Sequence, residues 1–237
     1  MRLKADLHLH TREGEAPIAY DALTLIDWAA RDGYQVLAIT NHNVVTWSEA
    51  LSAYARERGI LLIPGVEATI ERKHVLLYNI DVRPSRVRTF AELRRLKGSG
   101  WLVVAAHPFF PGPTHFGNRL LDEIDLFDGI EFSHFYTTRI DFNRPAARLA
   151  QVVGLPLLGS SDSHLADQFG TTYSLIDAEP EMDSVLTAIR KGAVDVVSSP
   201  LSLRRLVGIT ARLFLRSHAE EARDQSRVLA DSPGMGN

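Results

Sequence analysis

Histidine and acidic residues recur at the carboxyl ends of the strands that the sequence predicts. His8 and His10 lie two residues apart on one alternating strand, so both imidazoles point to the same side of that strand. Asp162 and His164 repeat the spacing directly after the apolar run 155–158. Imidazole and carboxylate groups in this arrangement can bind a divalent cation at about 2 Å. The chemistry that these pairs predict is therefore metal binding.

Five further histidine and acidic residues lie beside predicted strands or in the loop after the first strand. They are Glu15, His42, Glu67, His74 and His107. A single histidine at a strand end is more often structural than functional. So many imidazoles without partner charges would be costly to bury, however, and a site for several metal ions accounts for the whole set better.

These side chains need a scaffold in which strand ends converge. Short apolar runs alternate with segments of helical periodicity, which indicates βαβ units and a mainly parallel sheet. Strands are expected over residues 3–9, 36–40, 60–63, 74–80, 101–106, 129–133, 156–160, 173–176 and 195–197, and helices over 20–31, 47–58, 89–97, 120–127, 145–153 and 181–191. About six or seven units without an internal Gly/Ser linker favour a closed or nearly closed barrel, in which strand ends build the active site.

Composition narrows the possible function classes. The 237 residues include 26 Lys+Arg and 29 Asp+Glu, a formal net charge of −3, and 45% are hydrophobic. This mix is typical of a globular protein, and the near-neutral charge argues against a nucleic-acid scaffold. No apolar run is long enough to cross a membrane and no signal-peptide pattern is present, so we expect a cytoplasmic protein without a membrane partner. The absence of cysteine excludes disulfides, thiolate ligands and a cysteine nucleophile.

The chain is expected to form a single domain over residues 1–216. A closing helix is expected over 206–215, whereas residues 217–237 are charged and lack periodicity, which indicates a disordered tail. Neither this tail nor the histidines His115 and His218 receive a role. The oligomeric state stays open.

The sequence resembles the PHP (polymerase and histidinol phosphatase) family through motifs that stand in the family's order. They are DLHLHT, ITNHN, GVEAT with the following HVLLY, AAHPF and GSSDSH. The resemblance runs from about Asp6 to Tyr173 and so covers most of the chain. It implies an α/β fold of the distorted (β/α)7 TIM-like barrel type, and two or three divalent metal ions that hydrolyse phosphoesters.

The resemblance also implies which residues bind each ion. It places the first metal at His8, His10, Glu67 and Asp162, the second at Glu67, His74 and His107, and the third at His42, His164 and Glu15. Imidazole and carboxylate ligands suit manganese, zinc or iron and do not choose among them. Asn41 stands where relatives commonly carry aspartate, which predicts a softer affinity for the third metal.

The leading hypothesis is a metal-dependent phosphoesterase that acts on a small phosphorylated metabolite or nucleotide, with metal-bound hydroxide as the nucleophile. Glu67 and Asp162 are the predicted catalytic carboxylates, and His134 is a candidate substrate contact or proton donor to the leaving group. Arginine side chains that could bind phosphate are predicted at Arg12, Arg119 and Arg139.

Three alternatives remain open at this point. A nuclease that trims short oligonucleotides would need a basic, aromatic-lined channel, and no extended nucleic-acid groove is evident in the sequence. The same metals could hydrolyse a C–N or C–O bond instead. A non-catalytic metal-binding module is the third alternative, and it is disfavoured because none of the motif ligands is lost.

Overall fold

The structure is a computed structural model that describes residues 1–14, 18–80, 87–213 and 215. The described residues up to 201 form one compact unit, and those from 202 onward belong to a second, in which 203–213 are helical. The strands of the first unit are β1 (Arg2–Leu9), β2 (Val36–Ile39), β3 (Leu61–Leu62), β4 (Gly65–Ile70), β5 (Lys73–Tyr78), β6 (Leu102–Ala105), β7 (Gly129–Ser133), β8 (Leu157–Ser160), β9 (Thr172–Asp177) and β10 (Val194–Ser198). Its helices are α1 (Ala22–Arg31), α2 (Glu49–Arg56), α3 (Phe90–Leu96), α4 (Asn143–Val153) and α5 (Met182–Arg190).

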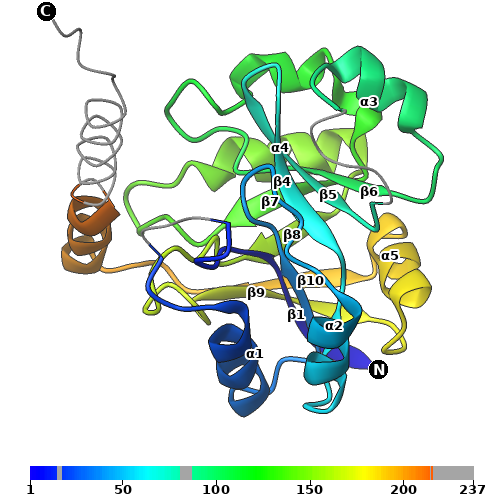
Figure 1. Cartoon of the computed structure of the whole chain (residues 1–237). Coiled ribbons are helices and arrows are strands. Elements are labelled where there is room, and N and C mark those ends of the chain that lie inside the picture. The colour runs from blue at the N-terminus through cyan, green and yellow to red at the C-terminus, as the bar shows by residue number, and fades with distance from the viewer. Residues whose placement is uncertain (15–17, 81–86, 214, 216–237) are drawn as a thin grey trace, which may run out of the picture. The chain divides into compact units, whose positions relative to one another are not determined.

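The strands form two mixed sheets rather than one barrel (Figure 1). Their orders are β10-β9-β1-β2-β3 and β4-β5-β6-β7-β8. The expected (β/α)7 TIM-like barrel is therefore wrong, since no closed sheet is formed by the described residues. The physical reason lies in four antiparallel neighbours, β1–β9, β9–β10, β4–β5 and β5–β6. A parallel barrel needs a crossover connection between each pair of neighbours, and antiparallel pairs do not use one.

The hairpin of β4 and β5 is the element that the sequence did not predict. The strands pair from Gly65 opposite Tyr78 to Ile70 opposite Lys73, with only Glu71 and Arg72 between them. Both turn residues have positive φ, 44° and 66°. Two-residue turns of this kind usually carry Asn or Gly, so the sequence offers no turn signal here. As a result Glu67 lies within a strand and not at a strand end.

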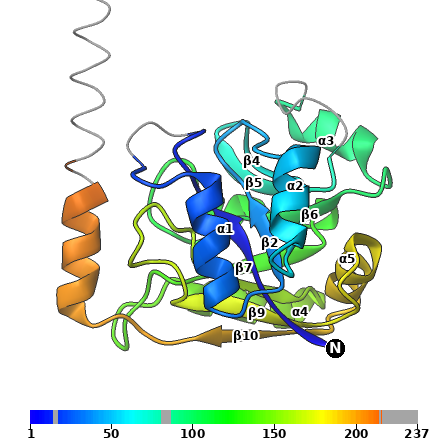
Figure 2. The ribbon, with the colours of Figure 1, turned by 60° about the horizontal axis from the view of Figure 1, so that its bottom comes forward.

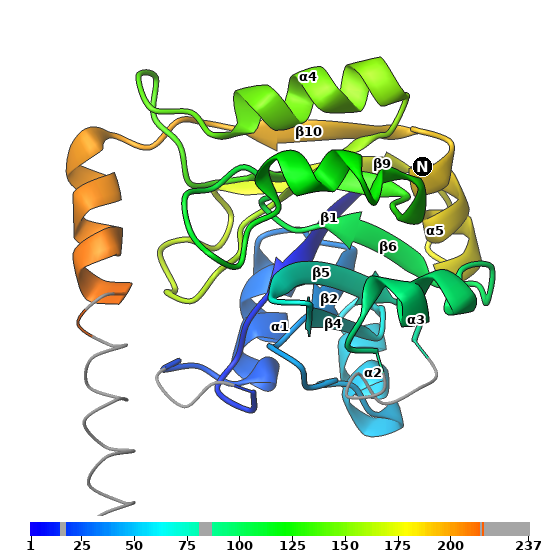
Figure 3. The same ribbon diagram turned by 90° about the horizontal axis from the view of Figure 1, so that it is seen from above.

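Three hydrophobic cores hold these layers together. One contains inward-facing residues of both sheets, such as Leu7 of β1 and Val104 of β6. A second packs the β4–β8 sheet against α3 and α4, and a third packs β2 against α1 and α2. Figure 2 shows α1 and α2 next to β2, and Figure 3 shows α3 and α4 outside the other sheet. Each sheet therefore has one face toward the shared core and one face covered by helices.

Side-chain caps fix where three of the helices begin. Asp21 accepts a hydrogen bond from the backbone of Thr24 at the start of α1, and Ser48 does the same for α2. Thr89 and Glu92 form a reciprocal capping box at the start of α3. The helix expected over 120–127 is instead two short 3-10 turns, Gly117–Leu121 and Ile124–Leu126.

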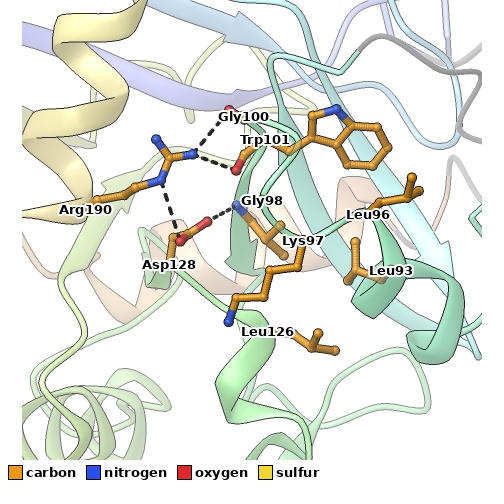
Figure 4. Close-up of a pocket in the computed structure, with 10 residues that line it drawn as sticks. Leu93, Leu96, Lys97, Gly98, Gly100, Trp101, Leu126, Asp128 and Arg190 are labelled. Carbon is orange, nitrogen blue, oxygen red and sulfur yellow. Dashed lines mark hydrogen bonds and ion pairs between the residues drawn. The ribbon is translucent and has the colours of Figure 1, made fainter.

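A polar link joins α5 to the second sheet at the amino ends of its strands (Figure 4). Arg190 donates hydrogen bonds to the carbonyl oxygens of Trp101 (2.6 Å) and Gly100 (3.2 Å). Its Nε lies 3.7 Å from Asp128 Oδ1. These groups border a cavity of about 370 Å³ that also includes Leu93. Arg190 thus connects the helix that packs on β9 to the strands of the other sheet.

Candidate metal centre

One carboxylate oxygen of Glu67 is surrounded by imidazoles. Glu67 is fully buried in β4. Its Oε2 lies 3.1 Å from His8 Nε2, 3.4 Å from His10 Nε2 and 3.1 Å from His42 Nδ1. Three ring nitrogens therefore converge on a single oxygen. His8 and His10 come from β1 and the residue after it, and His42 follows β2.

The second carboxylate oxygen of Glu67 faces a different pair of histidines. Its Oε1 lies 2.7 Å from His74 Nδ1 and 3.1 Å from His107 Nε2. His74 comes from β5 and His107 follows β6. The carboxylate of Glu67 thus stands between two groups of potential ligands.

Asp162 completes the cluster from the end of β8. Its Oδ1 lies 3.4 Å from His8 Nε2, 3.1 Å from His10 Nε2 and 3.4 Å from His164 Nδ1. Asp162 and His107 have positive φ, 45° and 27°. Such backbone conformations are unfavourable for residues other than glycine, and they concentrate at functional sites. The chain accepts this strain where it turns both side chains toward the cluster.

Four sets of three ligand atoms lie close enough to bind a cation, with all atoms of a set within 4.8 Å of one another. The sets are His8 with His10 and Glu67, His42 with Glu67 and His74, His8 with His107 and Asp162, and His10 with His42 and His164. Every predicted metal ligand except Glu15 belongs to at least one set. Glu15 lies outside the described residues. How the ligands divide among individual ions stays a prediction.

Glu131 is a buried carboxylate at the cluster that the sequence reasoning missed. It is buried in β7, and its carboxylate accepts hydrogen bonds from His8 Nδ1 (2.7 Å), the backbone N–H of His107 (2.6 Å) and Ser160 Oγ. Burial alone would raise the pKa of Glu131, but the neighbouring imidazole of His8 holds that pKa below its usual value. A charged residue inside the short apolar strand GIEFS was the available signal.

The hydrogen bond from His8 to Glu131 shows that the cluster suits a cation. A neutral His8 that donates its Nδ1–H to Glu131 turns an unprotonated Nε2 toward the carboxylates of Glu67 and Asp162. A lone pair that faces two anions is repelled unless a cation or a proton lies between them. The donor set, imidazole nitrogen and carboxylate oxygen without sulfur, is the set that manganese, iron and zinc bind. The residues present therefore fit a divalent metal centre.

The pKa shifts of Glu67 and His8 also indicate that the cluster attracts positive charge. Burial would raise the pKa of Glu67, but the imidazoles led by His8 and His42 hold it well below its usual range. Burial would likewise lower the pKa of His8, yet the carboxylates led by Glu131 and Asp162 raise it well above its usual value. The carboxylates attract positive charge into a buried site strongly enough to overcome desolvation, and divalent cations carry that charge more effectively than protons.

Asn41 holds the loops of the centre together by hydrogen bonds. Its Oδ1 accepts from the backbone N–H of Thr11 (2.8 Å), and its Nδ2 donates to Thr11 Oγ1 (3.0 Å) and Thr46 Oγ1 (2.7 Å). Gly14 lies against this side chain so closely that a Cβ would overlap it. The neutral amide thus ties the loop after His10 to the loop after His42.

The predicted arginines are not gathered at the metal ligands. Arg12 pairs with Asp21 at 2.6 Å, and Arg119 pairs with Glu71 on the hairpin turn. Arg139 is exposed in the loop after β7. Their roles in substrate binding stay predictions.

Two further histidines lie near the cluster outside the four ligand sets. His134 is buried, and burial lowers its pKa to about 4. The ring of His115 lies 4.7 Å from that of His107, and partial burial lowers its pKa to about 4 as well. Both rings are therefore neutral at pH 7.

None of the helices in the described part of the chain is long and apolar enough to cross a membrane.

Comparison with known proteins identifies similar sequences and folds. The PHP-associated family model matches residues 141–194. An uncharacterized protein of Methanocaldococcus jannaschii, MJ1587, is 28% identical over 144 residues, which are 56% of this chain and 83% of that protein.

Two solved structures share the fold. A two-domain protein of Bacteroides vulgatus that contains a predicted PHP-like metal-dependent phosphoesterase aligns with a TM-score of 0.66 at 20% identity, over 87% of this chain and 68% of that one. A protein of Bifidobacterium adolescentis, assigned by prediction as a metal-dependent phosphoesterase, aligns with a TM-score of 0.59 at 18% identity, over 81% of this chain and 96% of that one.

The mixed sheets and the buried cluster of imidazoles and carboxylates define a protein of the metal-binding α/β class. The match to the PHP-associated family model over residues 141–194 agrees with the resemblance to the PHP family that the ordered motifs from Asp6 onward carry.

Proposed function

We propose that this protein is a metal-dependent phosphoesterase that hydrolyses a small phosphorylated metabolite or nucleotide. The observation that carries the proposal is the position of Glu67, whose two oxygens each face a separate group of imidazoles. A carboxylate between two ligand groups can hold two cations about 3.5–4 Å apart, the spacing used by two-metal phosphoryl-transfer sites.

The residues of the chain then have distinct tasks. Cations bound at the cluster would supply positive charge to phosphate oxygens and lower the pKa of water. Glu67 would fix the spacing of the ligand groups, and Asp162 would close the cluster from the end of β8. Glu131 keeps the proton of His8 on Nδ1, so that Nε2 faces the cluster with its lone pair. Glu67 and His8 are fully buried, so their side chains are held in place by the surrounding protein.

The proposed partner is a small phosphorylated substrate. The relatives named as metal-dependent phosphoesterases support this bond class, and the ligand chemistry suits a dianionic ester. Manganese, iron and zinc are all compatible with the donor set, so the metal is defined only as a divalent cation.

Phosphate release tests the proposal. The protein is reconstituted separately with Mn²⁺, Fe²⁺ and Zn²⁺ and assayed on sugar phosphates, nucleoside monophosphates and bisphosphates, and short oligonucleotides. We expect phosphate release from at least one small ester, loss of that activity with a chelator, and recovery when metal is returned. Shortening of oligonucleotides without release from any small ester would favour a nuclease. Metal-loaded protein that cleaves none of these substrates would contradict a phosphoesterase.

A further inference from the structure

His134 follows β7, the middle one of three parallel strands whose outer two, β6 and β8, are followed by proposed metal ligands. The strands β6, β7 and β8 are parallel neighbours, and His107, His134 and Asp162 follow their carboxyl ends. Because parallel strand ends meet at one edge of a sheet, His134 stands beside the centre, between the ends that bear two of its ligands. It is 1% exposed.

Gln168 determines which nitrogen of His134 carries the proton. Gln168 Oε1 accepts hydrogen bonds from the backbone N–H groups of His164 (3.1 Å) and Leu165 (2.8 Å). The amide orientation is thereby fixed, since the opposite orientation would place N–H₂ against two N–H donors. Gln168 Nε2 then donates to His134 Nε2 at 3.0 Å. An accepting Nε2 bears no proton, so the neutral ring carries its proton on Nδ1.

The Nδ1–H of His134 has no hydrogen-bond partner among the described residues, although it is buried. A buried donor without an acceptor is unfavourable, and such groups call for a partner from outside the protein. Since Nε2 is occupied by Gln168, His134 is also not arranged as a metal ligand through that atom. The free donor and its place beside the ligand-bearing strand ends point to an acceptor bound at the centre.

We propose that His134 donates a hydrogen bond from Nδ1 to a phosphoryl oxygen of the bound substrate, and that Gln168 is the positioning residue that fixes this tautomer. The proposal rests on the proposed function of the centre. No proton is transferred, because the neutral imidazole acts only as a donor. Gln168 thereby fixes both the backbone of the loop that carries His164 and the tautomer of His134.

The tautomer is measured first, independently of activity. Nitrogen-15 chemical shifts of the His134 ring in the metal-free protein should show a protonated Nδ1 and an unprotonated Nε2. A ring protonated on Nε2 alone would overturn the proposal. In Gln168→Glu the carboxylate still accepts from the two backbone N–H groups but turns an acceptor toward His134, so Nε2 should gain a proton. The matched control Gln151→Glu, at an exposed position of α4, should leave the shifts unchanged.

The contact is measured by the affinity of the metal-loaded protein for inorganic phosphate. His134→Phe keeps a ring without a donor and should bind phosphate roughly tenfold more weakly, equivalent to about 1.4 kcal/mol. Its metal content should stay that of the wild type, and circular dichroism establishes that it is folded. In His134→Asn the amide N–H₂ is separated from Cα by the same number of bonds as Nδ1 of histidine, so this variant should recover part of the affinity for phosphate. The same variant tests the contact if His134→Phe does not fold.

The outcomes separate this proposal from the proposed function. Wild-type affinity for phosphate in His134→Phe would overturn the contact, whatever the protein hydrolyses. Loss of metal in that variant would make His134 a ligand and would also overturn it. A wild-type protein that binds phosphate through His134 but cleaves no ester would refute the phosphoesterase and leave the contact standing.

Discussion

Replacing Glu67 by glutamine is expected to remove metal from the centre and to lower hydrolysis by about a thousandfold or more. The two oxygens of Glu67 lie within 3.4 Å of five imidazoles, which come from both ligand groups. A neutral amide loses the charge that holds the cations, and its N–H₂ group meets ring nitrogens. Several kcal/mol of cationic stabilisation of the transition state are thereby lost.

Metal content and phosphate release together check this expectation. The control Glu57→Gln makes the same chemical change at an exposed carboxylate after α2 and should retain both properties. Circular dichroism of Glu67→Gln establishes that the fold persists. A variant that keeps its metal and its activity would show that Glu67 does not bridge the ligand groups.

Replacing Glu131 by glutamine is expected to weaken metal binding about 10- to 100-fold without abolishing it. The amide of glutamine can accept at only one of the two oxygen positions, so its N–H₂ group faces either the backbone N–H of His107 or the donors His8 Nδ1 and Ser160 Oγ. In either orientation a donor faces a donor, and the negative charge that holds the Nδ1–H of His8 is lost. Because a buried charged pair is broken, the free energy of unfolding of the metal-free protein should fall by about 3 kcal/mol.

Metal titration distinguishes the two glutamine variants. Excess metal should restore hydrolysis in Glu131→Gln, which keeps every ligand, and should fail to restore it in Glu67→Gln. Denaturant unfolding of the metal-free proteins measures the stability loss. Unchanged metal affinity and unchanged unfolding in Glu131→Gln would contradict a role for Glu131 in orienting His8.

The sequence was sufficient to predict most of the side chains that the structure gathers around Glu67, and insufficient to predict the residues that support them. Pairs such as His8 with His10 and Asp162 with His164 are visible because the two-residue spacing of a strand puts both side chains on one side. Glu131 forms no such pair, and its importance depends on three donors from β1, β8 and the loop after β6. Contacts between distant segments leave no local pattern that could reveal them.

For the fold as well, local features could be predicted from the sequence, whereas the pairing of distant strands could not. Apolar runs located most strands and helices to within a few residues, because burial of one face is a local property of the sequence. The β4–β5 hairpin was not predicted, because its turn residues Glu71 and Arg72 adopt positive φ although neither is glycine or asparagine. Whether the sheet closes is decided by which strand edges meet, as in the antiparallel pairing of β1 with β9. Periodicity along the chain does not encode that choice.

The proposed function depends most directly on the presence of a metal centre. Elemental analysis of protein purified without chelator and reconstituted with Mn²⁺, Zn²⁺ or Fe²⁺ measures the number of ions per chain. We predict about two or three tightly held ions, reduced in Glu67→Gln, as expected for a carboxylate that bridges two ligand groups. Fewer than about one ion per chain with all three metals would contradict the account, because the convergence of imidazoles on Glu67 would then serve no cation.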